Sequence, residues 1–123
     1  FEDQLLLDEI IKNGQTILNY EDCQNRIYIS ACGFYLNFEG IRFIAVNKAL
    51  ANSRIFESVP VDTYDAQMVF AWRKGDFWAV SMYASAWSNV DVSVIAKKYG
   101  GGGHKGAAGF QVKELPFPLK AKT

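Results

Sequence analysis

The stretch YGGGGHKGAAGF, from Tyr99 to Phe110, is the most unusual run in this sequence and organises the C-terminal half of the predicted fold. Six of its twelve residues are glycine, and His104 is the single histidine of the chain. Glycine allows positive φ and carries no side chain that would hold a ligand away. Successive backbone N–H groups can therefore converge on an anion. A purely structural bend around an ordinary histidine is an equal alternative on physical grounds.

The anion-binding interpretation assigns a role to each small residue of this run. The imidazole of His104 would donate to a phosphate oxygen, and the alanines would form a flat floor beneath a nucleotide or sugar. The run lacks the Gly-Lys-Ser/Thr ending of a Walker loop, and it follows a helix where a dinucleotide fingerprint would follow a strand. One histidine and two distant cysteines give no zinc pattern. The predicted phosphate-binding residues are Gly101, Gly102, Gly103, His104, Ala107, Ala108 and Gly109.

The elements around this run alternate between short strands and helices. Asp91 is a natural N-cap for a helix that ends at Tyr99, with Gly100 as its C-cap. Between Asn47 and Val59 we expect a short helix that turns Leu50, Ile55 and Phe56 inward. The predicted strands are Phe34–Phe38, Ile41–Val46, Ala66–Trp72, Phe77–Tyr83 and a last strand GFQV, with turns at Glu39-Gly40 and at RKGD.

The N-terminal segment predicts an amphipathic helix from Leu5 to Tyr20, with Gly14 on its apolar stripe to allow close packing. We expect residues 1–28 to form this helical lead-in and residues 29–123 to form the core with the glycine-histidine loop. The fold class is α/β (α+β), a single domain with a mixed β-sheet packed by helices. The chain begins with Phe1 rather than methionine, from which we expect a piece of a longer polypeptide.

Composition narrows the possible partners and location. Thirteen basic residues balance thirteen acidic ones, so no strong global field attracts nucleic acid or membrane. The longest apolar run is far shorter than the ~20 residues of a membrane-spanning helix. Cys23 and Cys32 form no disulfide framework and are expected to be reduced, small core residues. These features predict a cytoplasmic protein with no membrane partner.

One motif of this sequence is long and specific: it consists of Asp91-Val92-Ser93, Ile95-Ala96 and the run Lys98 to Phe110. The motif closely resembles the signature of the DHH-associated domain, the C-terminal domain of DHH-family phosphoesterases such as oligoribonucleases, cyclic-dinucleotide phosphodiesterases and exopolyphosphatase-related proteins. The segments AVNKALANSRIFES (45–58) and GDFWAVSMY (75–83) are similar in order and spacing.

The resemblance implies a division of labour between two domains. An N-terminal domain of the parent would carry the Asp-His-His motif and a manganese pair that activates water. The associated domain would hold an oligonucleotide or related phosphate-ester substrate against those metals. This chain has no Asp-His-His, and its one histidine cannot build a two-metal centre. It is therefore expected to be the substrate-binding half, with no catalytic residue, metal or cofactor of its own.

One segment departs from the family pattern. Many members carry an arginine within Ser-x-Arg-Ser, whereas here the segment is Ser81-Met82-Tyr83-Ala84-Ser85. Tyr83 can stack on a base or donate one hydrogen bond, but it cannot form a bidentate pair with phosphate. Ser81 and Tyr83 are candidate binding residues, with ordinary sheet-face roles as the alternative. Asn47 and Ser53 are further polar candidates that are also natural helix-start residues.

An RNA-contacting appendage, of the kind that alanyl-tRNA synthetases carry as a related domain, is the alternative function. RNA contact usually shows a basic stripe, and the neutral net charge weighs against it.

Overall fold

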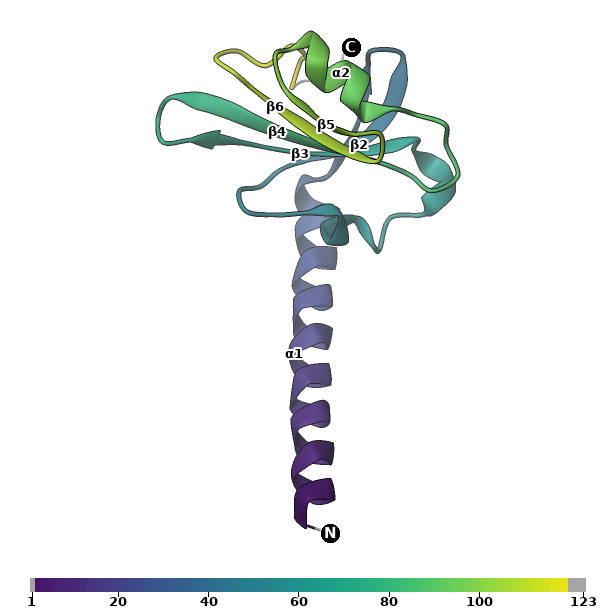
Figure 1. The fold of residues 1–123 in the computed structure, drawn as a ribbon, viewed down its shortest axis with the longest axis vertical. Coiled ribbons are helices and arrows are strands. Elements are labelled where there is room, and N and C mark those ends of the chain that lie inside the picture. Colours follow the sequence, from purple (N-terminus) through teal and green to yellow (C-terminus); the bar gives the residue numbers. More distant parts are fainter. Residues whose placement is uncertain (1, 120–123) are drawn as a thin grey trace.

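A computed structural model describes residues 2–119, which form a sheet-based domain from which one long helix projects (Figure 1). Phe1, which the sequence analysis singled out, lies outside the described residues. The elements are α1 (Glu2–Cys32), β1 (Phe34–Phe38), β2 (Ile41–Asn47), η1 (Ser53–Phe56), η2 (Val61–Thr63), β3 (Ala66–Arg73), β4 (Phe77–Ala84), α2 (Val92–Lys98), β5 (Gly102–His104) and β6 (Ala107–Val112).

The six strands form one mixed sheet in the order β1-β2-β3-β4-β6-β5. Strands β2 and β3 run parallel, and all other neighbours are antiparallel. The two predicted hairpins, β1–β2 and β3–β4, are confirmed, with their turns at Glu39-Gly40 and at residues 73–76. The predicted α+β class, with helices packed on a mixed sheet, is also confirmed.

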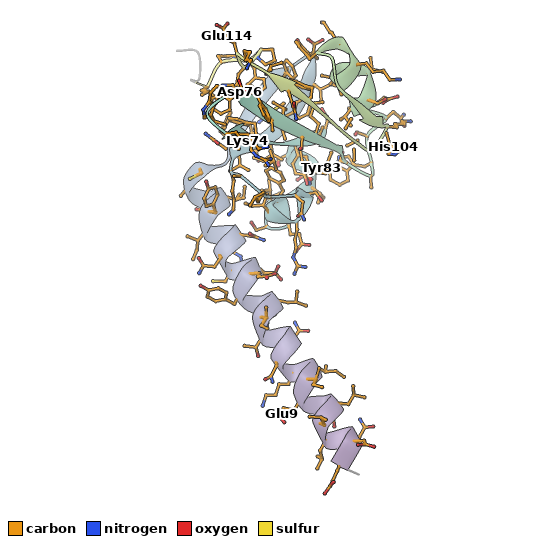
Figure 2. All side chains as sticks on the ribbon, turned by 60° about the vertical axis from the view of Figure 1, so that its left-hand side comes forward. Glu9, Lys74, Asp76, Tyr83, His104 and Glu114 are labelled. Carbon is orange, nitrogen blue, oxygen red and sulfur yellow. The ribbon has the colours of Figure 1, made fainter. Side chains whose placement is uncertain are left out.

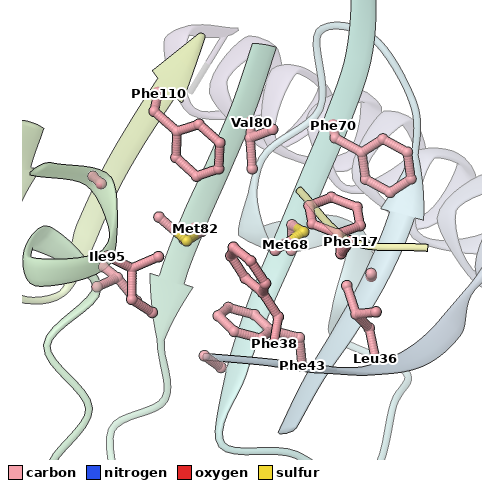
Figure 3. Packing of buried hydrophobic residues seen from close by; sticks show 14 of the residues in the cluster. Leu36, Phe38, Phe43, Met68, Phe70, Val80, Met82, Ile95, Phe110 and Phe117 are labelled. Carbon is pink, nitrogen blue, oxygen red and sulfur yellow. The ribbon is translucent and has the colours of Figure 1, made fainter. Parts of the chain in front are cut away.

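One face of the sheet is covered by α2 and holds the main core (Figure 3). Phe43, Met68 and Met82 are fully buried there, and Phe110 packs beside them from β6. Burying one such side chain stabilises a fold by about 1.5–3 kcal/mol. The C-terminal segment closes this core, because the Phe117 ring stacks edge-on against Phe38 and Phe70.

The opposite face is covered only in part, by η1 and the last turns of α1. Ile55 and Phe56 of η1 are buried there, as the sequence predicted. Ile29 of α1 joins the same cluster, together with Ile44 and Val69 from the sheet. This second cluster lies over β2 and β3, so most of the face formed by β4, β6 and β5 has no helix on it.

Helix α1 extends beyond both ends of the predicted Leu5–Tyr20 helix and past the expected boundary at residue 28. It ends at Cys32, and the N–H of the next residue, Gly33, donates to the Ile29 carbonyl at 2.8 Å. A Cβ at Gly33 would lie 2.8 Å from that same oxygen, so only glycine fits there. The extension could not be seen in the sequence because the tertiary contact of Ile29, not helix propensity, holds the last turns.

Two expectations about exposure, those for Leu50 and for the cysteines, are wrong. Leu50 is 91% exposed, because it lies in a turn after β2 with φ of +57° that points it into solvent. Cys23 and Cys32 are free, as predicted, but both are exposed. Gly14 has nothing within 4 Å of where a Cβ would sit, because the N-terminal part of α1 packs on nothing in the described chain.

Helix α2 has the predicted N-cap, but it ends at Lys98 with Tyr99 as its C-cap, one residue before the predicted positions. The Asp91 carboxylate accepts from the Ser93 N–H at 3.0 Å, and Gly100 adopts φ of +85° just past the helix. The amides of Gly100 and Gly101 donate to the last free carbonyls of the helix, those of Lys97 and Ala96. No helix within residues 2–119 combines the length and apolar character needed to cross a membrane.

Candidate functional site

The glycine run forms a β-hairpin rather than the predicted loop. Strand β5 pairs antiparallel with β6, and Lys105-Gly106 forms the two-residue turn between them. Glycine is rare in strands, so strand β5 could not be expected from local propensity. The hairpin lies at the end of the sheet, with β5 outermost, so the outer backbone edge of Gly102–His104 faces no other strand of the described chain.

Three glycines of the predicted site are required by close backbone packing. A Cβ on Gly101 would lie 2.1 Å from the Gly109 carbonyl oxygen. A Cβ on Gly103, whose φ is +143°, would lie 2.6 Å from the Ala107 carbonyl, and one on Gly109 would lie 2.7 Å from the Val80 carbonyl. Gly102 differs, because a Cβ there would meet nothing within 4 Å. Its missing side chain leaves open space above the strand.

The strand register brings most of the predicted site residues onto one face. Residues directly opposite each other on neighbouring strands share a face. Tyr83 lies opposite Ala107, and Ala107 lies opposite His104, so these side chains form one row. The adjacent row contains Ser81, Gly109 and Gly102.

This shared surface, which we call the open face, is defined by Ser81, Tyr83, Gly102, His104, Ala107 and Gly109. It lies on the side of the sheet opposite α2, the side from which α1 projects, and Figure 2 shows Tyr83 and His104 there. His104 and Ala107 are exposed, and Tyr83 and Ser81 are half-buried. The imidazole is thus accessible, and small residues surround it.

Three predicted residues lie outside the open face, and Gly103 is one of them, because it lies opposite Ala108 on the other side of the sheet. The methyl group of Ala108 points toward α2 and is buried in the core. The Gly101 N–H donates to the Ala96 carbonyl at 2.8 Å. The predicted cluster of free amides therefore does not include Gly101.

The turn of the hairpin is fixed by bonds to two other elements. The Lys105 carbonyl accepts from the Val92 N–H at 3.1 Å, and the Gly106 carbonyl accepts from the Ala84 N–H at 3.0 Å. These bonds hold the hairpin against the start of α2 and the end of β4. His104 thus has a fixed position relative to Tyr83, even though it lies on an edge strand.

A groove of about 560 Å³ adjoins the open face between the end of β4 and η1. Ser53, one of the polar candidates from the sequence, lies in its wall. Its other lining residues include Arg54, Tyr64, Gln67, Tyr83, Trp87 and Gly106. The sequence analysis did not identify Arg54, Tyr64, Gln67 and Trp87, because these four residues lie outside the glycine motif. Gln67 alone left a signal, as a polar residue within the apolar strand β3.

Arg54, which lines the groove, is paired with an acidic side chain of α1. The Arg54 guanidinium donates to the Asp22 carboxylate of α1 at 3.0 Å. This hydrogen bond raises the pKa of Arg54 above its ordinary value, and the charge of Asp22 adds to the effect. The pair also ties η1 to α1. Within residues 2–119, no three His, Cys, Asp or Glu side chains gather as a metal site would require.

Comparisons with known proteins yield structural likeness alone. No family model matches this sequence, and no curated protein matches it. A pGpG-specific phosphodiesterase, PggH from Vibrio cholerae, matches with a TM-score of 0.64 and 18% identity over 86% of this chain. An uncharacterized protein from Helicobacter pylori G27 matches with a TM-score of 0.51 and 16% identity over 76% of this chain.

These matches show a shared fold. This chain spans 40% of the length of the first protein and 26% of the second. The match with PggH covers 86% of this chain. The residues that follow α1 make up a smaller share of the chain than this, so the likeness extends into α1.

Proposed function

We propose that this chain is the substrate-binding domain of a DHH-family phosphoesterase, and that it holds the phosphate of a short oligonucleotide or related phosphate ester on the open face. The row of Tyr83, Ala107 and His104 carries this proposal, because it places one exposed imidazole beside small residues on an uncovered part of the sheet. The shared fold with a phosphodiesterase supports the same class of reaction.

The open face offers three kinds of contact to a phosphate. The imidazole of His104 donates a hydrogen bond, most strongly when it is protonated. The phenol of Tyr83 donates another, without the bidentate geometry of an arginine. Gly102 leaves room for the anion to approach the backbone of β5. Together these groups position the ester and leave the bond-breaking chemistry to another domain.

The catalytic step belongs, in this proposal, to a DHH domain that precedes the chain in its parent. That domain would bind the manganese ions, which lower the pKa of water and polarise the phosphoryl group. The role of the open face is then to orient the substrate. Correct orientation contributes a large part of the rate in such reactions, because it removes the entropic cost of bringing the groups together.

The exposed part of α1 supports a partner domain on the same side. An apolar stripe, Leu7, Ile11, Gly14 and Leu18, runs along it, and Leu7, Ile11 and Leu18 are each at least 40% exposed. Residues 11 and 18 lie on nearly the same helix face as Ile29, which packs under η1. A domain seated along this stripe would therefore face the groove and the open face. The helix, roughly 46 Å long, is long enough to carry it.

A hydrolysis assay with pGpG and manganese tests whether this chain binds substrate while another domain carries out catalysis. The 123-residue chain is expected to bind pGpG and leave it intact, since the metal-binding domain is a separate part of the parent. Calorimetry measures binding, and chromatography of the same sample measures cleavage. Turnover by the purified chain would contradict the assignment of catalysis elsewhere. Absence of binding would contradict the substrate-binding role itself.

The tRNA-binding alternative predicts a different result. Contacts to the RNA backbone release counterions, so affinity for tRNA would fall steeply between two salt concentrations. The balanced charge of the chain favours the phosphoesterase role, for which we expect no salt-sensitive tRNA binding.

A further inference from the structure

We infer that the groove beside Tyr83 binds the base of the nucleotide whose phosphate lies near His104. This inference rests on the proposed function and adds a second subsite to it. The groove and the open face share Tyr83, and Gly106 of the hairpin turn also lines the groove. Tyr83 and His104 are two strand positions apart, or ~10 Å across the sheet. One nucleotide covers such a span between its phosphate and the far edge of its base.

The size of the groove suits a group of this kind. Its volume of about 560 Å³ lies within the range of small-molecule sites, which is roughly 300–1,000 Å³. Phe56 and Val59 provide a buried apolar floor, 1% and 8% exposed. A flat aromatic heterocycle would cover this floor and keep its polar edge toward the groove walls.

Trp87 provides a stacking surface at the edge of the groove. Its side chain is 51% exposed, although indole rings are normally well buried. The ring is also held in place, because it packs against Tyr64 with centroids 5.6 Å apart. An exposed but positioned aromatic ring is the usual platform for a base in proteins that bind single strands.

Gln67 provides a fixed polar group. Its Nε2 donates to the Tyr64 hydroxyl at 3.0 Å, which orients the side-chain amide. The carbonyl oxygen and the second N–H of this amide are then available to one edge of a base, as in other base-recognition contacts. Tyr64 thus supports both the stacking ring and the polar contact.

The charges in the walls favour an uncharged base over a second phosphate. Arg54 is already paired with Asp22 at 3.0 Å, and Glu57 lines the same wall as Arg54. A phosphate group in the groove would lie near the Glu57 carboxylate without a free cation to offset it. A neutral ring carries no such penalty.

A titration series tests the base subsite separately from the phosphate site. The probes are guanosine 5′-monophosphate and ribose 5-phosphate, which lacks the base. The variants are Trp87→Ala and Gln67→Ala in the groove and His104→Ala on the open face. Trp72→Ala is the matched control, because Trp72 is a similarly exposed indole, 46%, that does not line the groove.

We expect the wild-type chain to bind guanosine 5′-monophosphate at least tenfold more tightly than ribose 5-phosphate. Trp87→Ala should weaken the nucleotide by roughly 5- to 100-fold and leave ribose 5-phosphate unchanged, as loss of one stacking contact predicts. Gln67→Ala should weaken the nucleotide alone, and Trp72→Ala should change neither. Circular dichroism of each variant verifies folding.

The outcomes that overturn the two proposals differ. If His104→Ala weakens both probes while Trp87→Ala and Gln67→Ala change neither, the base subsite is refuted and the phosphate site stands. If Trp87→Ala weakens the nucleotide while His104→Ala changes nothing, the groove binds a base and the proposed phosphate site is refuted.

Discussion

At the scale of single residues, the glycines of the run Tyr99 to Phe110 divide into two kinds. Gly101, Gly103 and Gly109 are fixed by packing, because a Cβ on any of them would lie under 3.0 Å from a backbone oxygen. Gly102 faces open space, and its small size is not needed by the fold. The proposed role of Gly102 in ligand approach would account for glycine at that position.

This division predicts opposite effects for two alanine substitutions. Gly101→Ala should lower the free energy of unfolding by about 1–3 kcal/mol, because the added methyl group collides with the Gly109 carbonyl. Gly102→Ala should leave the urea midpoint close to that of the wild type and weaken the binding of phosphate esters. A Gly102→Ala chain that is strongly destabilised, with unchanged ligand affinity, would show that this glycine serves the fold alone.

At the scale of elements, the turn between β1 and β2 is joined to the end of α2 by one acidic side chain. Glu39 accepts from Lys98 Nζ at 2.9 Å and from the Tyr99 hydroxyl at 2.7 Å. The Tyr99 hydrogen bond, followed by Lys98, lowers the pKa of Glu39 below its ordinary value of 4.5, and the same contact raises the pKa of Tyr99. The contact thus stabilises the ionised form of Glu39.

The sign of this pKa shift predicts how stability depends on pH. Because the pKa of Glu39 is lower in the folded state, its contribution is complete above about pH 4.5 and is lost as pH falls through the folded value. Glu39→Gln should therefore be less stable than the wild type at pH 7, with a smaller difference at pH 3. Urea midpoints at the two pH values measure this. Glu9→Gln, on the exposed part of α1 (Figure 2), is the control and should show no such pattern.

Much of the element order could be predicted from sequence, because local signals agree with the fold. Alternating apolar residues mark β1, continuous apolar runs mark β2 to β4, and Asp91 and Gly100 mark the two ends of α2. Strand β5 could not be predicted, since glycine has low strand propensity and the pairing with β6 alone defines it. The end of α1 likewise depends on the burial of Ile29 beneath η1.

At the scale of the whole molecule, the candidate site is a product of the sheet register. The glycine motif identified His104 and its neighbours, and the family pattern pointed to Ser81 and Tyr83. Only the pairing of β4, β6 and β5 shows that these residues share one face. The groove residues Gln67 and Trp87 belong to other segments, so their place beside Tyr83 could not be read from any local pattern.

The two sides of the sheet differ in how completely they are covered. The α2 side is a closed core, whereas the opposite side carries the open face, the groove and the exposed stripe of α1. A substrate-binding domain that works against a second domain needs this asymmetry, because the substrate must lie between the two.

The central claim is that His104 and its row hold the phosphate of the substrate. Its most direct test is a comparison of pGpG binding by the wild-type chain and by His104→Ala, with Lys97→Ala, at an exposed position of α2, as the control. Loss of one charge-assisted hydrogen bond predicts a dissociation constant about 10- to 100-fold larger for His104→Ala. The dissociation constant of Lys97→Ala should equal that of the wild type. Equal affinities of a folded His104→Ala chain and the wild type would contradict the account.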